Sequence, residues 1–128
     1  MTGGVYLDSS ALVKLVAPEP ETAALLEYLG EPRRAVLISE LTVTEVTRAA
    51  RRIGVDASPA LGECDVVLLR SELLAAAGTL DPPTLRTLDA IQLATALSLG
   101  DAIETFVAYD ERLAAAAAAH GLQVGAPI

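Results

Sequence analysis

Residues 5–16 read VYLDSSALVKLV, and this stretch decides how the rest of the sequence is interpreted. The apolar run Val5–Leu7 ends at Asp8, which is the pattern of a short buried strand. Two serines follow, and apolar residues then recur at the spacing of a helix. The stretch therefore predicts a strand, a sharp turn and a helix, with a serine as the residue that caps the helix N-terminus.

The same alternation continues along the chain. Compact apolar runs predict further strands, and segments with helical spacing that end at Gly or Pro predict the helices between them. Alternating strands and helices favour an α/β fold in three layers, with a central, mainly parallel sheet and helices on both faces. The expected strands are 34–39, 105–109 and 122–124; the expected helices are 21–29, 40–53, 71–78, one from Thr84 or Thr87 to about Leu99, and 111–120; 59–64 is helix or turn, and 65–69 is a strand or part of a helix.

Length and composition define the class of protein. A chain of 128 residues with 52% hydrophobic and 20% charged residues fits one globular domain, here residues 1–128, and excludes a disordered chain. Cys64 is the single cysteine, so an internal disulfide framework and the usual zinc cages are excluded. The net charge of −8, from 17 acidic residues against 9 Lys and Arg, argues against a broad basic surface for nucleic acid but leaves room for a local basic patch.

No segment of the sequence has the pattern of a membrane span or a targeting signal. The first residues, Met1–Gly4, carry no positively charged side chain, and Asp8 interrupts the apolar run that follows. The longest apolar run, Leu113–Ala119, is far shorter than a membrane-spanning helix requires. We therefore expect a cytoplasmic protein that makes no contact with a membrane.

Two acidic residues are expected at the carboxyl ends of strands. Asp8 closes the first strand, and Asp110 follows the strand expected over 105–109. In a doubly wound parallel sheet, ligands bind outside the carboxyl ends of the strands, where the strand order reverses. If the two strands are neighbours, these carboxylates approach each other, which is unfavourable unless a cation or a proton lies between them. The alternative is that each aspartate is a turn or cap residue.

Two further acids are expected on helices. Asp89 stands among apolar residues, where a lone buried carboxylate is costly. The alternatives are that Thr87 is the N-cap and Asp89 is stabilised in the first turn of the helix, or that Asp89 forms an ion pair with Arg86. Glu45 lies beside the apolar stripe of its helix, and the alternative for it is an exposed face shared with arginines. That stripe comprises Val43, Val46, Ala50 and Ile53, Ser39 is the expected cap of the helix, and the arginines are Arg48 and Arg52.

The four acids together indicate one kind of chemistry. Carboxylates that converge from four elements make an oxygen-only site for a hard divalent cation such as Mg²⁺. Such a cation lowers the pKa of a bound water and neutralises charge on a phosphate. One His, one Cys and the lack of a Gly-rich phosphate loop or a G-x-S-x-G motif leave other catalytic chemistries poorly supported. The four residues are Asp8, Glu45, Asp89 and Asp110.

The segments around these acids resemble the motifs of one family. The run VYLDSSALVKL at 5–15 resembles the opening motif of PIN-domain ribonucleases of the VapC type, the toxins of type II toxin–antitoxin systems. Thr44–Val46 with Arg48, the run RTLDAIQLATA at 86–96 and the run FVAYDERL at 106–113 resemble their second, third and fourth motifs. The resemblance spans nearly the whole chain. Gln92 and Ala108 depart from it, because many members have His and Thr at these positions, but no motif acid is lost.

The resemblance implies a metal-dependent endoribonuclease. Asp8, Glu45, Asp89 and Asp110 would hold Mg²⁺ or Mn²⁺, and a metal-activated water would hydrolyse an RNA phosphodiester to leave a 5′-phosphate and a 3′-hydroxyl. Ser10, or failing that Ser9, would place a hydroxyl at the site or serve as a helix cap, and Arg48 and Arg86 would contact RNA phosphates or lie on the solvated surface. The implied partners are RNA, a cognate VapB-like antitoxin and a second copy of the chain in a homodimer.

Two other functions fit parts of the pattern. One is a non-catalytic module of the same PIN fold that binds RNA or protein, against which the complete set of four acids argues. The other is a phosphoacceptor receiver domain, which is also a small acidic α/β fold with magnesium. A receiver domain would need paired acids after its first strand and a late lysine, whereas Asp8 is followed by two serines and Lys14 is the last lysine in the chain.

Overall fold

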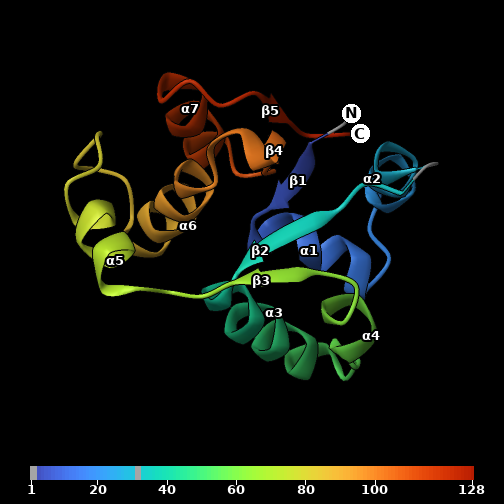
Figure 1. The fold of residues 1–128 in the computed structure, drawn as a ribbon. Coiled ribbons are helices and arrows are strands. Elements are labelled where there is room, and N and C mark those ends of the chain that lie inside the picture. The colour runs from blue at the N-terminus through green and yellow to red at the C-terminus, as the bar shows by residue number, and fades with distance from the viewer. Residues whose placement is uncertain (1–2, 31–32) are drawn as a thin grey trace.

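The computed structural model describes residues 3–30 and 33–128, which form three layers (Figure 1). The described residues contain a five-stranded parallel sheet in the order β3-β2-β1-β4-β5, so the expected α/β/α fold is confirmed. Residues 1–2, part of the stretch that we interpreted as lacking a targeting signal, lie outside the described residues. The elements are β1 (Gly4–Leu7), α1 (Ser9–Val16), α2 (Thr22–Leu29), β2 (Val36–Ser39), α3 (Glu40–Ile53), α4 (Ser58–Leu61), β3 (Asp65–Val67), α5 (Ser71–Gly78), α6 (Thr87–Ser98), a 3₁₀ turn (Gly100–Ala102), β4 (Ile103–Val107), α7 (Glu111–Ala119) and β5 (Val124–Gly125).

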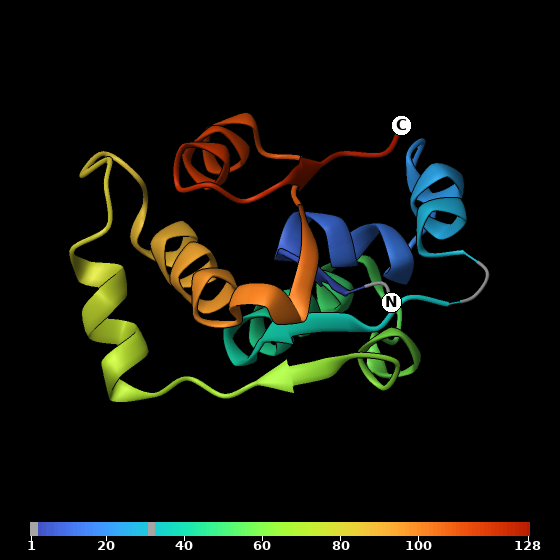
Figure 2. The same ribbon diagram turned by 45° about the horizontal axis from the view of Figure 1, so that its top comes forward.

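Strand β1 divides the core into two halves. Successive residues of a strand point to opposite faces of its sheet. Val5 and Leu7 are fully buried in a cluster with residues of α1, α2 and α3, whereas Tyr6 is fully buried in a cluster with residues of α6 and α7. Figure 1 shows α3 and α4 on one side of the sheet and α6 and α7 on the other, and Figure 2 shows α5 beside α6 at the edge of the molecule. Helices therefore cover both faces of the sheet.

The strand order reverses between β1 and β4. From β1 the chain proceeds outward through β2 to β3, and then returns to form β4 on the other side of β1. Leu7 is in register with Val107, so the two strands end at the same level. The chain segments that follow β1 and β4 therefore begin next to each other at one edge of the sheet. Asp8 and Asp110 belong to these two segments.

Two expectations about helix caps were wrong, whereas Thr87, one of the two expected starts of α6, is confirmed. Asp8, rather than a serine, caps α1, because its carboxylate Oδ1 accepts a hydrogen bond of 3.0 Å from the backbone N–H of Ala11. Helix α6 begins at Thr87 itself, and Arg86 occupies the cap position without a side-chain hydrogen bond to the helix. Asp89 nevertheless lies in the first turn of α6, as expected. The cap expected for α3 is confirmed, since Ser39 Oγ accepts from the N–H of Leu41 at 3.1 Å.

Other differences arise from neighbouring elements. Strand β4 ends at Val107 rather than at Tyr109 because its partner β1 ends at Leu7. The last strand lies at Val124–Gly125, later than expected, where it pairs with the end of β4. Ile53 was expected in the buried stripe of α3, yet it is 57% exposed. An amphipathic pattern predicts which face of a helix is covered, but not how far along the helix the covering elements extend.

Candidate functional site

Asp8 is a buried carboxylate at the point where the strand order reverses. Its side chain follows β1 directly and is only 4% exposed. The pKa of Asp8 is raised to about 6, mainly by burial and to a smaller extent by the nearby charges of Asp89 and Asp110. Two hydrogen bonds oppose this effect: Ser10 Oγ donates to Oδ1 at 2.7 Å, and the N–H of Ala11 donates to the same oxygen.

Asp110 is the counterpart of Asp8 after β4. It caps α7, and its Oδ1 accepts a hydrogen bond of 3.0 Å from the N–H of Leu113. In contrast to Asp8, the side chain of Asp110 is exposed. Because β1 and β4 are parallel neighbours, the two strand-end acids lie at the same edge of the sheet. Their charges are close enough for Asp110 to raise the pKa of Asp8.

Asp89 reaches the same region from α6. It is half-buried, and burial is the largest cause that raises its pKa, followed by the charge of Asp110. The positive charge of Arg86 opposes this rise, while Glu45 adds to it. Among the described residues, however, no ion pair within 4.0 Å joins Asp89 to Arg86, so the expected pair is not formed. Asp89 therefore interacts electrostatically with each of the other three acids: its charge raises the pKa of Asp8, and the charges of Asp110 and Glu45 raise its own pKa.

Glu45 enters from α3 and is held by hydrogen bonds. It is half-buried, and its Oε1 accepts bonds from Ser9 Oγ at 2.6 Å and from Gln92 Nε2 at 3.2 Å. An exposed face of Glu45 with Arg48 and Arg52 was the alternative interpretation. Both arginines are exposed, but within the described part of the chain neither forms an ion pair with Glu45. The glutamate faces α1 and α6 instead.

The four acids fit a divalent metal by their chemistry, although they are not arranged around one. Within residues 3–30 and 33–128, no three Asp, Glu, His or Cys side chains stand close enough to hold an ion. Their charges nevertheless interact, since Asp89 and Asp110 raise the pKa of Asp8, and Asp110 and Glu45 raise the pKa of Asp89. Oxygen ligands of this kind are those that Mg²⁺ and Mn²⁺ prefer.

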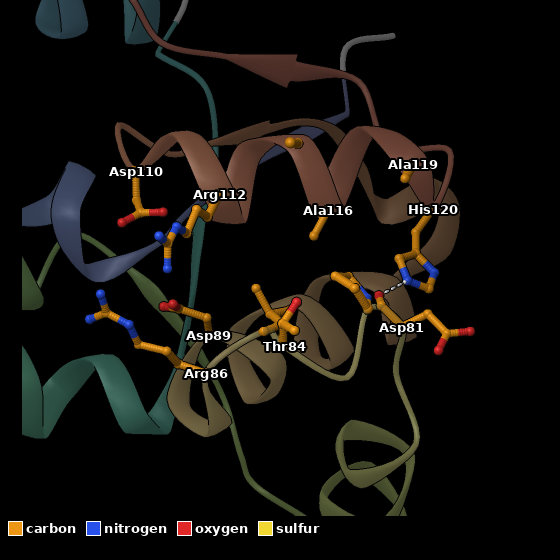
Figure 3. Close-up of a pocket in the computed structure, with 12 residues that line it drawn as sticks. Asp81, Thr84, Arg86, Asp89, Asp110, Arg112, Ala116, Ala119 and His120 are labelled. Atoms are coloured by element: carbon orange, nitrogen blue, oxygen red, sulfur yellow. Dashed lines mark hydrogen bonds between the residues drawn. The ribbon is translucent and has the colours of Figure 1, made fainter.

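A groove of about 970 Å³, here called the groove between α6 and α7, separates α7 from the segment 81–89, which leads into the first turn of α6. Figure 3 shows Asp89 and Asp110 at one end of it, with the side chains of Arg86 and Arg112 beside them. At the other end, His120 Nε2 lies 2.7 Å from the backbone oxygen of Asp81. The acidic site is therefore open to a molecule much larger than an ion, and two cationic side chains stand at its mouth.

The supporting residues proposed from the sequence occupy different surroundings. Ser10 Oγ donates to Asp8 and accepts from the N–H of Tyr109 at 3.1 Å, so it ties the two strand ends together. Arg86 is exposed and lines the groove. Arg48 is exposed on α3, one turn beyond Glu45.

Four residues around the acids were not assigned to the site from the sequence. Ser9 was considered only as a substitute for Ser10, and Gln92 only as a departure from the family pattern. A signal for two of them was present, because Thr42 stands three residues before Glu45 and Gln92 three residues after Asp89, a spacing that places side chains on one helix face. The four residues are Ser9, Thr42, Gln92 and Arg112.

In the part of the chain that the structure describes, no helix combines the length and the apolar character that crossing a membrane demands.

The fold and the acidic site together define a class of protein. A model of the PIN domain family matches residues 5–119, so this chain belongs to the PIN domain family. Two relatives are proteins of Mycobacterium tuberculosis. One, named Ribonuclease VapC46, is 43% identical over 127 residues, which cover 96% of this chain and 97% of that protein. The other, named Ribonuclease VapC35, is 38% identical over 130 residues, which cover 96% of each chain.

Solved structures show the same fold. The crystal structure of Mycobacterium tuberculosis VapC20, described as a sarcin-ricin loop cleaving toxin, superposes with a TM-score of 0.71 at 18% identity. The superposition covers 97% of this chain and all of that one. A chain of a toxin–antitoxin complex from Klebsiella pneumoniae has a TM-score of 0.69 at 22% identity, and covers 84% of this chain and 87% of its own. At these identities the likeness concerns the fold alone.

Proposed function

We propose that this chain is an RNA-hydrolysing endonuclease and the toxin of a VapBC-type toxin–antitoxin module. The family match and the relatives named Ribonuclease VapC support this function over nearly the whole chain. We also propose that residues 1–128 form a single PIN domain, of which the family model matches 5–119. The observation that carries the activity is that acids from separate elements meet where the strand order reverses, close enough for their charges to raise the pKa of Asp8 and of Asp89.

We propose that Asp8, Glu45, Asp89 and Asp110 hold Mg²⁺ or Mn²⁺, directly or through water. Asp8 is buried and already carries two hydrogen bonds on Oδ1, so Oδ2 is its oxygen for the ion. Asp110 is exposed, and its Oδ1 is used as a helix cap. Such an ion supplies an activated water and neutralises charge on the phosphate. Because its binding favours the ionised form of Asp8, it offsets the effect of burial on that pKa.

The groove between α6 and α7 is the proposed binding surface for RNA. Arg86 and Arg112 stand beside Asp89 and Asp110 at its acidic end, where a phosphodiester would have to lie for cleavage. Guanidinium groups bind phosphate oxygens with two parallel hydrogen bonds. Two local arginines thus allow a chain of net charge −8 to hold a short stretch of RNA without a broad basic surface. Arg48 is a further candidate contact, one turn beyond Glu45.

The proposed partners follow from the family. The complex from Klebsiella pneumoniae contains a toxin and an antitoxin, which supports a cognate VapB-like antitoxin for this chain as well. A homodimer, alone or in a higher complex with antitoxin, and a cytoplasmic location where cellular RNA lies complete the proposal.

The test is cleavage of total bacterial RNA, mapped by sequencing the new ends. Wild-type protein and Asp89→Asn, both free of antitoxin, are compared with Mn²⁺, Mg²⁺ and EDTA. We expect cuts that need both the metal and Asp89, and circular dichroism should show that the variant is folded. Binding of RNA without cleavage by folded wild-type protein would refute the enzyme and favour the non-catalytic PIN-fold module that binds RNA or protein.

A further inference from the structure

Gln92 is the centre of a buried hydrogen-bond network that joins four elements. Its side chain lies on α6, one turn beyond Asp89, and the residue is 2% exposed. Its amide oxygen accepts from Tyr6 on β1, and its amide nitrogen lies within hydrogen-bond distance of hydroxyl or carboxylate oxygens on α1 and α3. These oxygens are Thr42 Oγ1 at 2.8 Å, Ser9 Oγ at 3.1 Å and Glu45 Oε1 at 3.2 Å.

Tyr6 sets the orientation of this amide. Its hydroxyl donates to Gln92 Oε1 at 2.5 Å. Burial holds the pKa of Tyr6 far above its usual range, so the hydroxyl keeps its proton and acts as a donor. If the amide turned over, Oε1 would face the carboxylate of Glu45 and two acceptors would repel each other. The network therefore has one favourable arrangement, in which the N–H groups point toward Glu45.

The network acts on one oxygen of Glu45. Both hydrogen bonds that Glu45 accepts among the described residues, from Gln92 and from Ser9, end on Oε1. Ser9 Oγ donates to Glu45 and lies 3.1 Å from Gln92 Nε2, so it connects the amide to the carboxylate, and the two N–H groups of the amide are shared among Thr42, Ser9 and Glu45. Oε2 is left as the oxygen that can bind a ligand. Thr42, on the same face of α3 as Glu45, anchors the amide from the other side.

We propose that Gln92, oriented by Tyr6, is a positioning residue that holds Glu45 ready to bind the divalent metal of the site. This inference rests on the proposed function, because it assigns Gln92 a role in the metal site proposed there. Partners that orient a metal ligand typically change metal affinity or activity by about 10- to 100-fold when they are removed. Gln92 does not touch the metal in this proposal, and it acts only through Glu45.

The test is a double-mutant cycle on metal affinity. Calorimetric titration with Mn²⁺ alone measures the dissociation constant of wild type, Gln92→Leu, Glu45→Gln and the double variant. We expect Gln92→Leu to weaken Mn²⁺ binding by about 10- to 100-fold in the wild-type background. In the Glu45→Gln background it should weaken binding by less than about twofold, because the partner through which it acts is already changed. Equal losses in both backgrounds, or no loss in either, would overturn the inference.

Tyr6→Phe provides a second variant that keeps the shape of the core. It removes the hydroxyl that orients the amide, and we expect it to weaken Mn²⁺ binding as well. The matched control is Tyr28→Phe, which removes a hydroxyl bonded to Thr105 Oγ1 at 2.7 Å and should leave the affinity unchanged. Equal behaviour of the two tyrosine variants would contradict the role of Gln92. Failure of wild-type protein to bind Mn²⁺ would instead reject the proposed metal site itself, so the two failures are distinguishable.

Discussion

Ser10 Oγ donates a hydrogen bond of 2.7 Å to Asp8 Oδ1 and at the same time accepts one from the N–H of Tyr109. A single hydroxyl thus connects the residue that follows β1 with the segment that follows β4. The contact favours the ionised form of the most buried acid of the site, because it lowers a pKa that burial raises. The serine stabilises both the charge and the relative placement of the two strand ends.

Replacing this serine should therefore change the ionisation of Asp8. In Ser10→Ala, the hydrogen bond that lowers the pKa is lost, and we expect the pKa of Asp8 to rise above about 6. The carboxyl carbon shift of Asp8, followed by NMR against pH in metal-free protein, measures the change. Ser98→Ala is the control, because Ser98 donates to the backbone oxygen of Thr95 instead. A pKa of Asp8 that stayed the same or fell would rule out this role for Ser10.

Asp8→Asn should stabilise the metal-free protein at neutral pH. The folded pKa of about 6 lies above the ordinary value of 3.8, so the folded state binds more protons than the unfolded state between these values. Stability then decreases as pH rises from about 4 to 6, and the full cost of about 3 kcal/mol is present above pH 6. Asparagine avoids this cost and keeps an oxygen that accepts from Ala11.

Urea unfolding in EDTA at pH 4 and pH 7 measures this effect. We expect the advantage of Asp8→Asn over wild type to reach up to about 3 kcal/mol at pH 7 and to vanish near pH 4. Asp101→Asn, a change at an exposed aspartate, should have little effect at either pH. A metal-free Asp8→Asn protein much less stable than wild type at pH 7 would argue against clustered, mutually repelling acids.

Arg112 should affect RNA binding rather than the chemical step. In Arg112→Gln, one guanidinium at the acidic end of the groove is lost. We expect KM to rise several-fold with kcat little changed, and the slope of log affinity against log salt to decrease by about 1. Steady-state cleavage and binding of a short RNA at several salt concentrations measure both quantities. Arg51→Gln, at an exposed arginine in the last turn of α3, is the control; an equal effect there would indicate general attraction instead.

Cys64 should have no part in the reaction. It is half-buried, its Sγ donates to the backbone oxygen of Ala60 at 3.4 Å, and burial raises its pKa to about 11. The thiol is therefore neutral and poorly nucleophilic at pH 7. We expect Cys64→Ser to cleave RNA at the wild-type rate and wild-type protein to react slowly with iodoacetamide. Complete loss of cleavage in a folded Cys64→Ser protein would refute this interpretation.

Local patterns were enough to predict the fold and to select the four acids. Asp8 and Asp110 each follow an apolar run, and their proximity was expected on the condition that the two strands are neighbours, which the pairing of β1 with β4 fulfils. The resemblance to PIN-domain ribonucleases implied that Glu45 and Asp89 belong to the same site. These predictions rest on residues that are close in the sequence or on one simple rule of topology.

The network around Gln92 could not be predicted in this way. Tyr6 and Gln92 are 86 residues apart, and their contact depends on how α6 packs against β1. The bond from Gln92 to Glu45 depends further on how α3 meets α6 across the edge of the sheet. The i, i+3 spacings indicate a shared helix face, but not which other element that face meets. Ile53 was misplaced for a related reason, since burial depends on neighbours beyond the helix.

The helix caps formed by Asp8 and Asp110 predict which of the four acids would be retained in related proteins that have lost catalysis. Each aspartate accepts a hydrogen bond from the first turn of the helix that follows it, so selection for folding alone would retain it, or accept Asn or Ser in its place. Asp89 caps no helix in this structure and would drift once catalysis was lost, whereas Glu45 is also held in the hydrogen-bond network around Gln92. In a survey of related genomes, Asp89 would therefore be the better marker of a working toxin.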